Sequence, residues 1–223
     1  MTRFALTLEK LGFFKDTIME TIVSTYDERG RPNAAPMGVI AIEPRKILIR
    51  PHVSSSTYRN LMANRCAVVN VTSDPVMFFY TAFKEANIGG SAPLDWFEKA
   101  KTVNAPRLKS ADAIIEVSVS EIKPSNFFAE FSCDVKFVWA SKVLPRAYCR
   151  AYFATIEAII HATRVKSFLT SNSAEREKAA SLINLIKHYQ EITNRVAPNS
   201  KCSEIMANLI GMIESWEQNE GLR

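Results

Sequence analysis

Residues 21–50 read TIVSTYDERGRPNAAPMGVIAIEPRKILIR, and this stretch decides how the first part of the chain folds. Residues 21–26 are β-branched and aromatic, as is typical of strands, and residues 27–30 have the composition of a hairpin turn. A second apolar run covers residues 32–42, and after another turn a short strand ends at residue 50. Because the turns are tight, we expect these strands to pair as an antiparallel meander.

After residue 50 the chain contains a short predicted helix and further strands, and it then becomes helical. Residues 84–110 are polar and lack periodicity, which predicts an excursion outside a barrel. Hydroxyl residues precede the first helix, and Ser173 is the expected N-cap of a later one. The predicted elements are helices over residues 58–64 and 146–169, a helix that follows Ser173 and carries apolar residues at helical spacing over 182–192, a helix with an apolar face over 205–216, and strands over residues 66–72, 114–119 and 135–139.

Composition describes a globular α+β protein and restricts its partners. Of the 223 residues, 47% are hydrophobic and 23% are charged, and the net charge of +5 is spread along the chain. No basic arm suggests a nucleic-acid partner. The most apolar helical stretch, residues 151–162, contains Glu157 and is too short to cross a bilayer, so we expect no membrane partner. We predict a barrel over residues 1–145 and a helical region over residues 146–223.

Cysteine and histidine usage bears on metals and on the cell compartment. The cysteines at 66, 133, 149 and 202 form no C-x-x-C pair, and the chain has three histidines, none near a cysteine. A structural zinc site is therefore not expected, and no other metal is assigned. The N-terminus lacks the basic start and apolar stretch of a signal peptide. We expect reduced thiols in the cytoplasm.

A run of hydroxyl residues at the start of the first predicted helix is the most informative candidate site. Ser54, Ser55, Ser56 and Thr57 stand where the backbone N–H groups of a helix have no intrahelical acceptor. With a nearby cation, either Arg50 or Arg59, such a helix start suits a phosphate. The alternative interpretation is an ordinary N-cap followed by a polar loop.

A second candidate lies in residues 33–38, where small residues and a proline interrupt a predicted central strand. Backbone N–H and C=O groups that neighbouring strands do not use can hydrogen-bond the edge of a flat heterocycle. The alternative is a β-bulge or barrel corner, which favours glycine and proline equally. The two candidates follow each other in an order that suits a ring at one end and a phosphate at the other.

Together these segments resemble the FMN-binding split-barrel superfamily, which includes flavin reductases and proteins like pyridoxamine-phosphate oxidase. More specifically, the chain resembles the family of domain of unknown function 447. The segments that carry the resemblance are residues 20–25, 32–38, 56–61, 69–75 and, in the helical region, Arg150 with residues 156–164.

The resemblance implies an antiparallel split barrel with FMN at the interface of a homodimer. It places the isoalloxazine ring against the backbone at residues 35–39, the phosphate at residues 54–57, and Asn70 and Thr72 at the ribityl chain or ring edge. The expected FMN-binding residues are Ala35, Pro36, Met37, Gly38, Val39, Arg50, Ser54, Ser55, Ser56, Thr57, Asn70 and Thr72.

Flavin binding leaves several functions open. The leading hypothesis is an FMN-dependent oxidoreductase acting on a small cytoplasmic molecule or a nicotinamide cofactor, although no acid–base pair and no Gly-rich dinucleotide motif is evident. The alternatives are a non-catalytic flavin carrier or sensor, and the same fold holding F420 or haem. Catalytic residues and the substrate are not identified.

Two other groups of residues have competing interpretations. One group consists of Glu157, His161 and Arg164, which share one face of a predicted helix. The alternatives for this group are an internal ion-pair network, the lining of a pocket and a metal site. The aromatic run at residues 77–80 shields a flavin or packs inside the barrel, and packing is the default for such a run.

Overall fold

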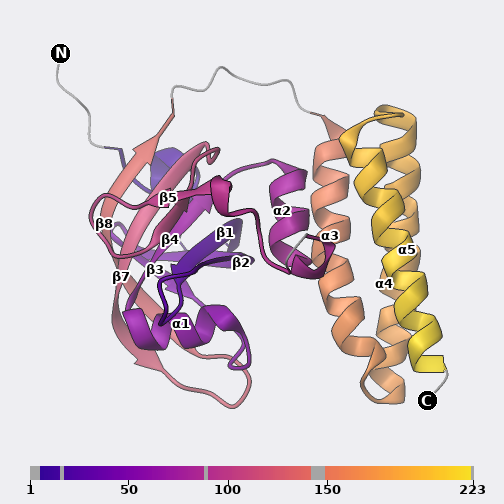
Figure 1. Cartoon of the computed structure of the whole chain (residues 1–223), viewed down its shortest axis with the longest axis horizontal. Coiled ribbons are helices and arrows are strands. Elements are labelled where there is room, and N and C mark those ends of the chain that lie inside the picture. Colours follow the sequence, from indigo (N-terminus) through magenta and orange to yellow (C-terminus); the bar gives the residue numbers. More distant parts are fainter. Residues whose placement is uncertain (1–5, 16–17, 88–89, 142–148, 222–223) are drawn as a thin grey trace. The chain divides into compact units, whose positions relative to one another are not determined.

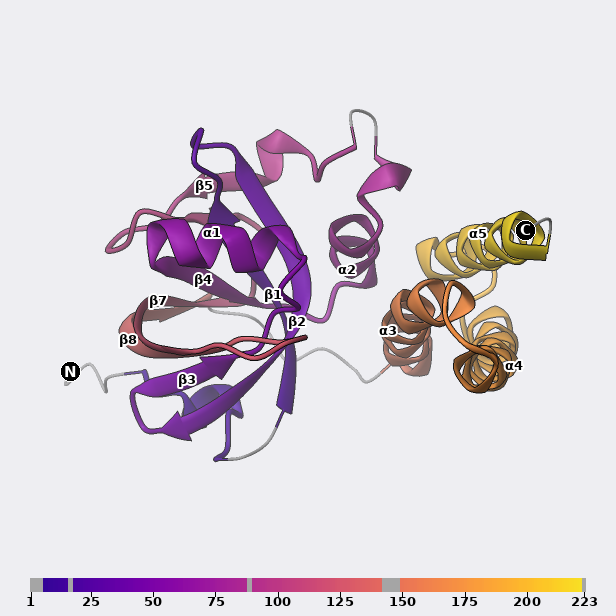
Figure 2. The ribbon, with the colours of Figure 1, turned by 90° about the horizontal axis from the view of Figure 1, so that it is seen from below.

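The structure, a computed structural model, describes residues 6–15, 18–87, 90–141 and 149–221 (Figure 1). Six antiparallel strands close into a barrel in the order β1-β2-β3-β8-β7-β4 (Figure 2). The predicted β1–β2–β3 meander is confirmed by the register of both hairpins. The barrel strands are β1 (Ile18–Tyr26), β2 (Pro32–Glu43), β3 (Lys46–Ile49), β4 (Cys66–Val71), β7 (Ala113–Lys123) and β8 (Glu130–Ala140).

Alternation along the strands builds the core of the barrel. Residues two apart in a strand point to the same face, and every barrel strand contributes apolar residues in this way, as Ile47 and Ile49 do from β3. Helix α1 (Ser56–Asn64) adds Leu61 to the same core, and the 3-10 turn η1 (Glu9–Leu11) is flanked by Leu8 and Phe13, which are also buried there.

The predicted excursion at residues 84–110 contains a small hairpin of its own. It begins with two 3-10 turns, η2 (Lys84–Ala86) and η3 (Leu94–Trp96), and continues as β5 (Phe97–Lys99) paired with β6 (Pro106–Leu108). Buried polar side chains of the barrel tie the hairpin down. Ser24 Oγ donates to the carbonyl of Pro106 at 2.6 Å, and the N–H of Leu108 donates to Asn70 Oδ1 at 2.8 Å.

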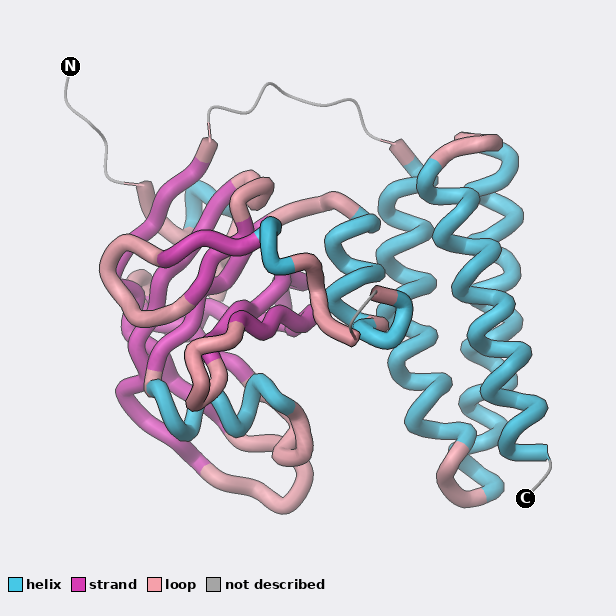
Figure 3. The backbone as a smooth tube through the Cα atoms, in the orientation of Figure 1, coloured by secondary structure: helices cyan, strands magenta, loops and turns pink. Residues whose placement is uncertain are grey.

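A second compact unit is helical and contains residues 73–83 and 145–223, whereas the barrel unit contains residues 1–72 and 84–144. Its helices are α2 (Pro75–Ala82), α3 (Arg150–Leu169), α4 (Ser173–Val196) and α5 (Lys201–Gly221) (Figure 3). The predicted boundary at residues 145 and 146 lies outside the described residues and stays a prediction. The same is true of residues 146–148, where the sequence begins the helix that the structure begins at Arg150.

Two details of the helical unit differ from the sequence-based expectation. The aromatic run at residues 77–80 forms α2, which Asp74 caps by accepting a hydrogen bond from the N–H of Val76. Phe78 and Phe79 are buried, so packing explains the run, but α2 belongs to the helical unit rather than to the barrel. Helix α4 is capped by Asn172 and not by Ser173, because the Asn172 carboxamide oxygen accepts from the N–H of Glu175.

Candidate functional site

The start of α1 presents backbone donors that the protein itself does not use. Ser55 is the N-cap, and its Oγ accepts a hydrogen bond from the N–H of Tyr58 at 3.1 Å. The next backbone bond of the helix runs from the N–H of Arg59 to the carbonyl of Ser55. Within the described part of the chain, the N–H groups of Ser56 and Thr57 therefore remain without an acceptor. Two open N–H groups at the positive end of a helix dipole make an anion site.

Arg59 is a candidate cation that lies beside these N–H groups. Its Nη1 donates to the carbonyl of Ser54 at 2.9 Å and its Nη2 donates to Ser56 Oγ at 3.1 Å, so the guanidinium folds back across the helix start. Arg50 is the other candidate cation from the sequence, and its guanidinium pairs with the Glu130 carboxylate of β8 at 3.1 Å. Because that carboxylate compensates the charge of Arg50, Arg59 is the better placed of the two to meet an anionic ligand.

The loop before α1 is held by the segment that leads into β8. The N–H of Val53 donates to the carbonyl of Phe127 at 2.9 Å, and the His52 ring meets the Phe128 ring edge-on at 5.3 Å. His52 Nδ1 accepts from the N–H of Ser54 at 3.2 Å and lies 2.8 Å from Ser54 Oγ. The Ser54 hydroxyl is thus already engaged by His52.

Strand β2 supplies the second half of the predicted site. It pairs with β1 over residues 32–40, but with β3 only from Val39 to Glu43. Within the described part of the chain, residues 32–38 thus have one backbone edge without a strand partner. The irregularity in this strand lies between Ala41 and Glu43, so the bulge considered for residues 33–38 is not found there.

The side chains of residues 35–39 are buried or half-buried, so the backbone is the candidate part of β2 for ligand contacts. Val39 is fully buried in the barrel core, and Met37 packs against that core. Ala35 and Pro36 are half-buried. A Cβ at Gly38 would lie only 2.7 Å from Ile18 Cγ2, so a larger residue there would require the exposed Ile18 side chain to shift.

Asn70 has a structural role in place of the predicted flavin contact. Its side chain is fully buried, and its Nδ2 donates to the carbonyl of Ile22 and to Ser24 Oγ. Its Oδ1 accepts from Leu108 of the β5–β6 hairpin. The amide is therefore used to join the hairpin to the barrel, and we withdraw it from the site. Thr72 directly follows β4 and is half-buried, and its predicted role stays untested.

One pair of residues near β2 was missed by the sequence analysis. Lys84, at the start of η2, donates from Nζ to Asn33 Oδ1. Within the described ranges the buried Asn33 Nδ2 has no hydrogen-bond partner, and burial lowers the pKa of Lys84. No local pattern predicts this contact, because the two residues are 51 positions apart.

A family model described as "Protein of unknown function (DUF447) N-terminal domain" matches residues 19–137, which is more than half of the chain. The chain belongs to the DUF447 family. The resemblance found in the sequence is thereby confirmed.

Solved structures place this DUF447 protein in the split-barrel fold. An FMN-bound protein from Methanosarcina mazei, of the same family, is 24% identical, with a TM-score of 0.73 over 92% of this chain and 99% of the other. A flavoredoxin from Methanosarcina acetivorans is 15% identical, with a TM-score of 0.50 over 56% of this chain and 69% of the other. A split-barrel protein from Shewanella frigidimarina is 14% identical, with a TM-score of 0.50 over 56% and 68%. The predicted α+β split barrel with C-terminal helices is confirmed.

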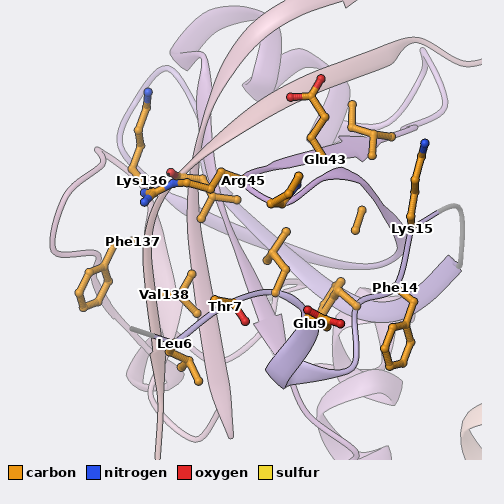
Figure 4. A pocket seen from close by; sticks show the side chains of 16 residues that line it. Leu6, Thr7, Glu9, Phe14, Lys15, Glu43, Arg45, Lys136, Phe137 and Val138 are labelled. Carbon is orange, nitrogen blue, oxygen red and sulfur yellow. Dashed lines mark hydrogen bonds between the residues drawn. The ribbon is translucent and has the colours of Figure 1, made fainter. Parts of the chain in front are cut away.

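A pocket of about 850 Å³ lies elsewhere in the barrel unit of the DUF447 protein (Figure 4). Residues 6–15, the β2–β3 turn and β8 line it, with Arg45 donating from Nη2 to the carbonyl of Val135 at 3.1 Å. None of the predicted binding residues contributes to it. The pocket lies at the end of β3 where that strand begins, next to the β2–β3 turn. The start of α1 comes after the other end of β3.

The helix face with Glu157, His161 and Arg164 is a packing feature of the helical unit. His161 Nε2 lies 3.9 Å from Glu157 Oε2, and its ring stacks on Tyr189 of α4 at 5.9 Å. Arg164 is exposed. Among the described residues, no three His, Cys, Asp or Glu side chains gather to hold a metal ion. The described helices also include none that is both long enough and apolar enough to cross a membrane.

Proposed function

We propose that this protein binds FMN, with the phosphate at the start of α1 and the isoalloxazine ring along the free edge of β2. The observation that carries the proposal is the pair of open N–H groups at Ser56 and Thr57 beside the Arg59 guanidinium. A helix start with an added cation suits a dianionic phosphate. The related protein from Methanosarcina mazei is described as FMN-bound, which supports the same ligand here.

The free edge of β2 has backbone groups for the ring. Proline has no N–H, so Pro36 cannot complete a two-bond pair with Ile22, its partner on β1. Alternation along an antiparallel pair then directs the backbone groups of Ala34, Pro36 and Gly38 to the free edge. The carbonyl of Met37 points the other way, since it accepts a hydrogen bond from Thr21 Oγ1 on β1 at 3.0 Å.

A bound FMN would supply hydride and single-electron chemistry, while the protein positions the ring and selects what approaches it. We propose an oxidoreductase acting on a small molecule or a nicotinamide cofactor. The fold shared with a flavoredoxin supports this class of activity.

Two measurements on the purified protein test the two parts of the proposal, FMN binding and oxidoreductase activity. Titration with FMN and with riboflavin should show clearly tighter binding of FMN, because only FMN has the phosphate. Mixing the FMN complex with NADH and with NADPH should then bleach the flavin absorbance. Absence of FMN binding would contradict the proposed site, and bound flavin that neither donor reduces would favour a carrier or sensor.

We further propose a homodimer in a reducing compartment, the cytoplasm. Phe127 and Phe128, beside the loop that leads into α1, are 68% and 53% exposed, as expected of apolar residues that a second copy covers. The four cysteines are all free thiols, which suits a reducing compartment.

A further inference from the structure

Lys84 places a positive charge beside a neutral hydrogen-bond acceptor. The residue is half-buried, and the acceptor of its Nζ is the neutral amide oxygen of Asn33. The neighbouring Glu85 carboxylate acts on Lys84 electrostatically, but among the described residues no carboxylate forms an ion pair with it. Removing a cation from water without an anionic partner is costly, so a ligand with negative charge or strong acceptors is favoured here.

Asn33 adds a second unused donor at the same place. Because the ammonium can only donate, it fixes the amide with Oδ1 toward Lys84 and Nδ2 directed away. That Nδ2 is buried and has no acceptor among the residues that the structure describes. A buried amide N–H without a partner usually costs about 1–3 kcal/mol. The pair therefore offers two neighbouring groups with N–H donors to spare: the Lys84 ammonium, which uses one of its three on Asn33 Oδ1, and the Asn33 Nδ2.

The pair also lies on the same face of the β1–β2 hairpin as the phosphate site. Asn33 pairs in register with Thr25 on β1, and directly opposed residues share a face. Thr25 Oγ1 accepts a hydrogen bond from Asn60 of α1 at 2.9 Å, so that face is the one next to the helix whose start forms the anion site.

We propose that Lys84 and Asn33 bind the pyrimidine edge of the flavin at N1 and C2=O, and that Lys84 stabilises the negative charge which the ring gains there on reduction. This inference rests on the proposed FMN function. The N1–C2=O edge presents two adjacent acceptors, which match two adjacent donors. In FMN that edge is also on the side of the ring that carries the ribityl phosphate, in agreement with the shared face.

The test compares the binding of oxidised and reduced FMN in matched variants. Lys84→Met should leave the affinity for oxidised FMN within a few-fold of wild type and weaken reduced FMN about tenfold more, which lowers the two-electron midpoint potential by about 30 mV. Lys84→Arg should retain the wild-type potential. Lys99→Met, at an exposed lysine of the same unit, is the control and should change neither quantity.

Asn33→Asp provides a second variant of nearly unchanged shape. The new carboxylate would pair with Lys84 and cancel its charge, so the potential should fall as in Lys84→Met. If wild type binds FMN and both variants keep its potential, the assignment of Lys84 and Asn33 is wrong while the proposed function stands. If wild type binds no FMN, the proposed function itself fails.

Discussion

At the scale of single residues, the two arginines near the start of α1 differ in whether a carboxylate pairs with them. Arg50 directly follows β3, and its guanidinium pairs with Glu130 at the start of the neighbouring strand β8. Arg59 lies one turn into α1, and its hydrogen bonds go to neutral oxygens of Ser54 and Ser56. A phosphate placed at the helix start would therefore meet one guanidinium that no carboxylate of the described residues neutralises.

Replacing Arg59 with Gln should weaken FMN binding about tenfold or more and leave riboflavin binding nearly unchanged. One hydrogen bond to a charged group contributes about 1.5–3 kcal/mol, and about 1.4 kcal/mol corresponds to tenfold. Fluorescence titrations with both ligands measure the ratio, and Arg50→Gln is the matched control with a near wild-type ratio. Equal losses for both ligands in Arg59→Gln would place the phosphate elsewhere. Ser55 is a poor target, because its hydroxyl caps α1.

At the scale of elements, buried polar side chains attach the β5–β6 hairpin to the barrel. Glu116 on β7 is fully buried, and its carboxylate accepts from the N–H groups of Lys101 and Thr102 at 2.8 and 2.6 Å. Thr102 adds its hydroxyl as a third donor. Asn70 on β4 acts in the same way on Leu108. A polar loop of this length thus stays ordered without an apolar periodicity of its own.

Glu116→Gln should lower the free energy of unfolding by about 2–3 kcal/mol, because an amide NH₂ would face backbone donors in a buried site. Chemical denaturation of the whole protein measures this change. Glu121→Gln, at an exposed position of the same strand, should have little effect. A Glu116→Gln variant as stable as wild type would show that the hairpin does not depend on this carboxylate.

The α3–α4 pair should make stability depend on pH through His161. Burial lowers the pKa of His161 from 6.5, while Glu157 opposes the shift and Arg164 adds to it; Tyr189 packs against the ring from α4. As the pH falls below about 6.5, His161 is therefore protonated in the unfolded chain before it is protonated in the folded protein, and the folded state loses stability. Between about pH 7 and pH 5 the midpoint of thermal unfolding should fall less in His161→Phe than in wild type. His188→Gln, exposed on α4, should keep the wild-type dependence.

At the scale of the whole molecule, the proposed homodimer follows from exposed aromatic residues beside the phosphate site. Light scattering should give twice the 25.0 kDa mass of the chain. Phe127→Ser should shift the protein toward monomer on dilution and weaken FMN binding. Leu94→Ser, at a residue that is also 68% exposed, should do neither. A wild-type protein that stays monomeric at high concentration would contradict the dimer.

Strand alternation, turn composition and helix caps are local signals, so the β1–β3 meander, α1 and the three C-terminal helices could be predicted from the sequence. The hydrogen bond between Asn70 and Leu108, the ion pair between Arg50 and Glu130, and the place of α2 in the helical unit appear only in the tertiary structure. It alone brought Lys84 to Asn33. Each of these outcomes depends on which groups a closed barrel and a packed helix bundle bring together across long separations, and local periodicity does not encode such contacts.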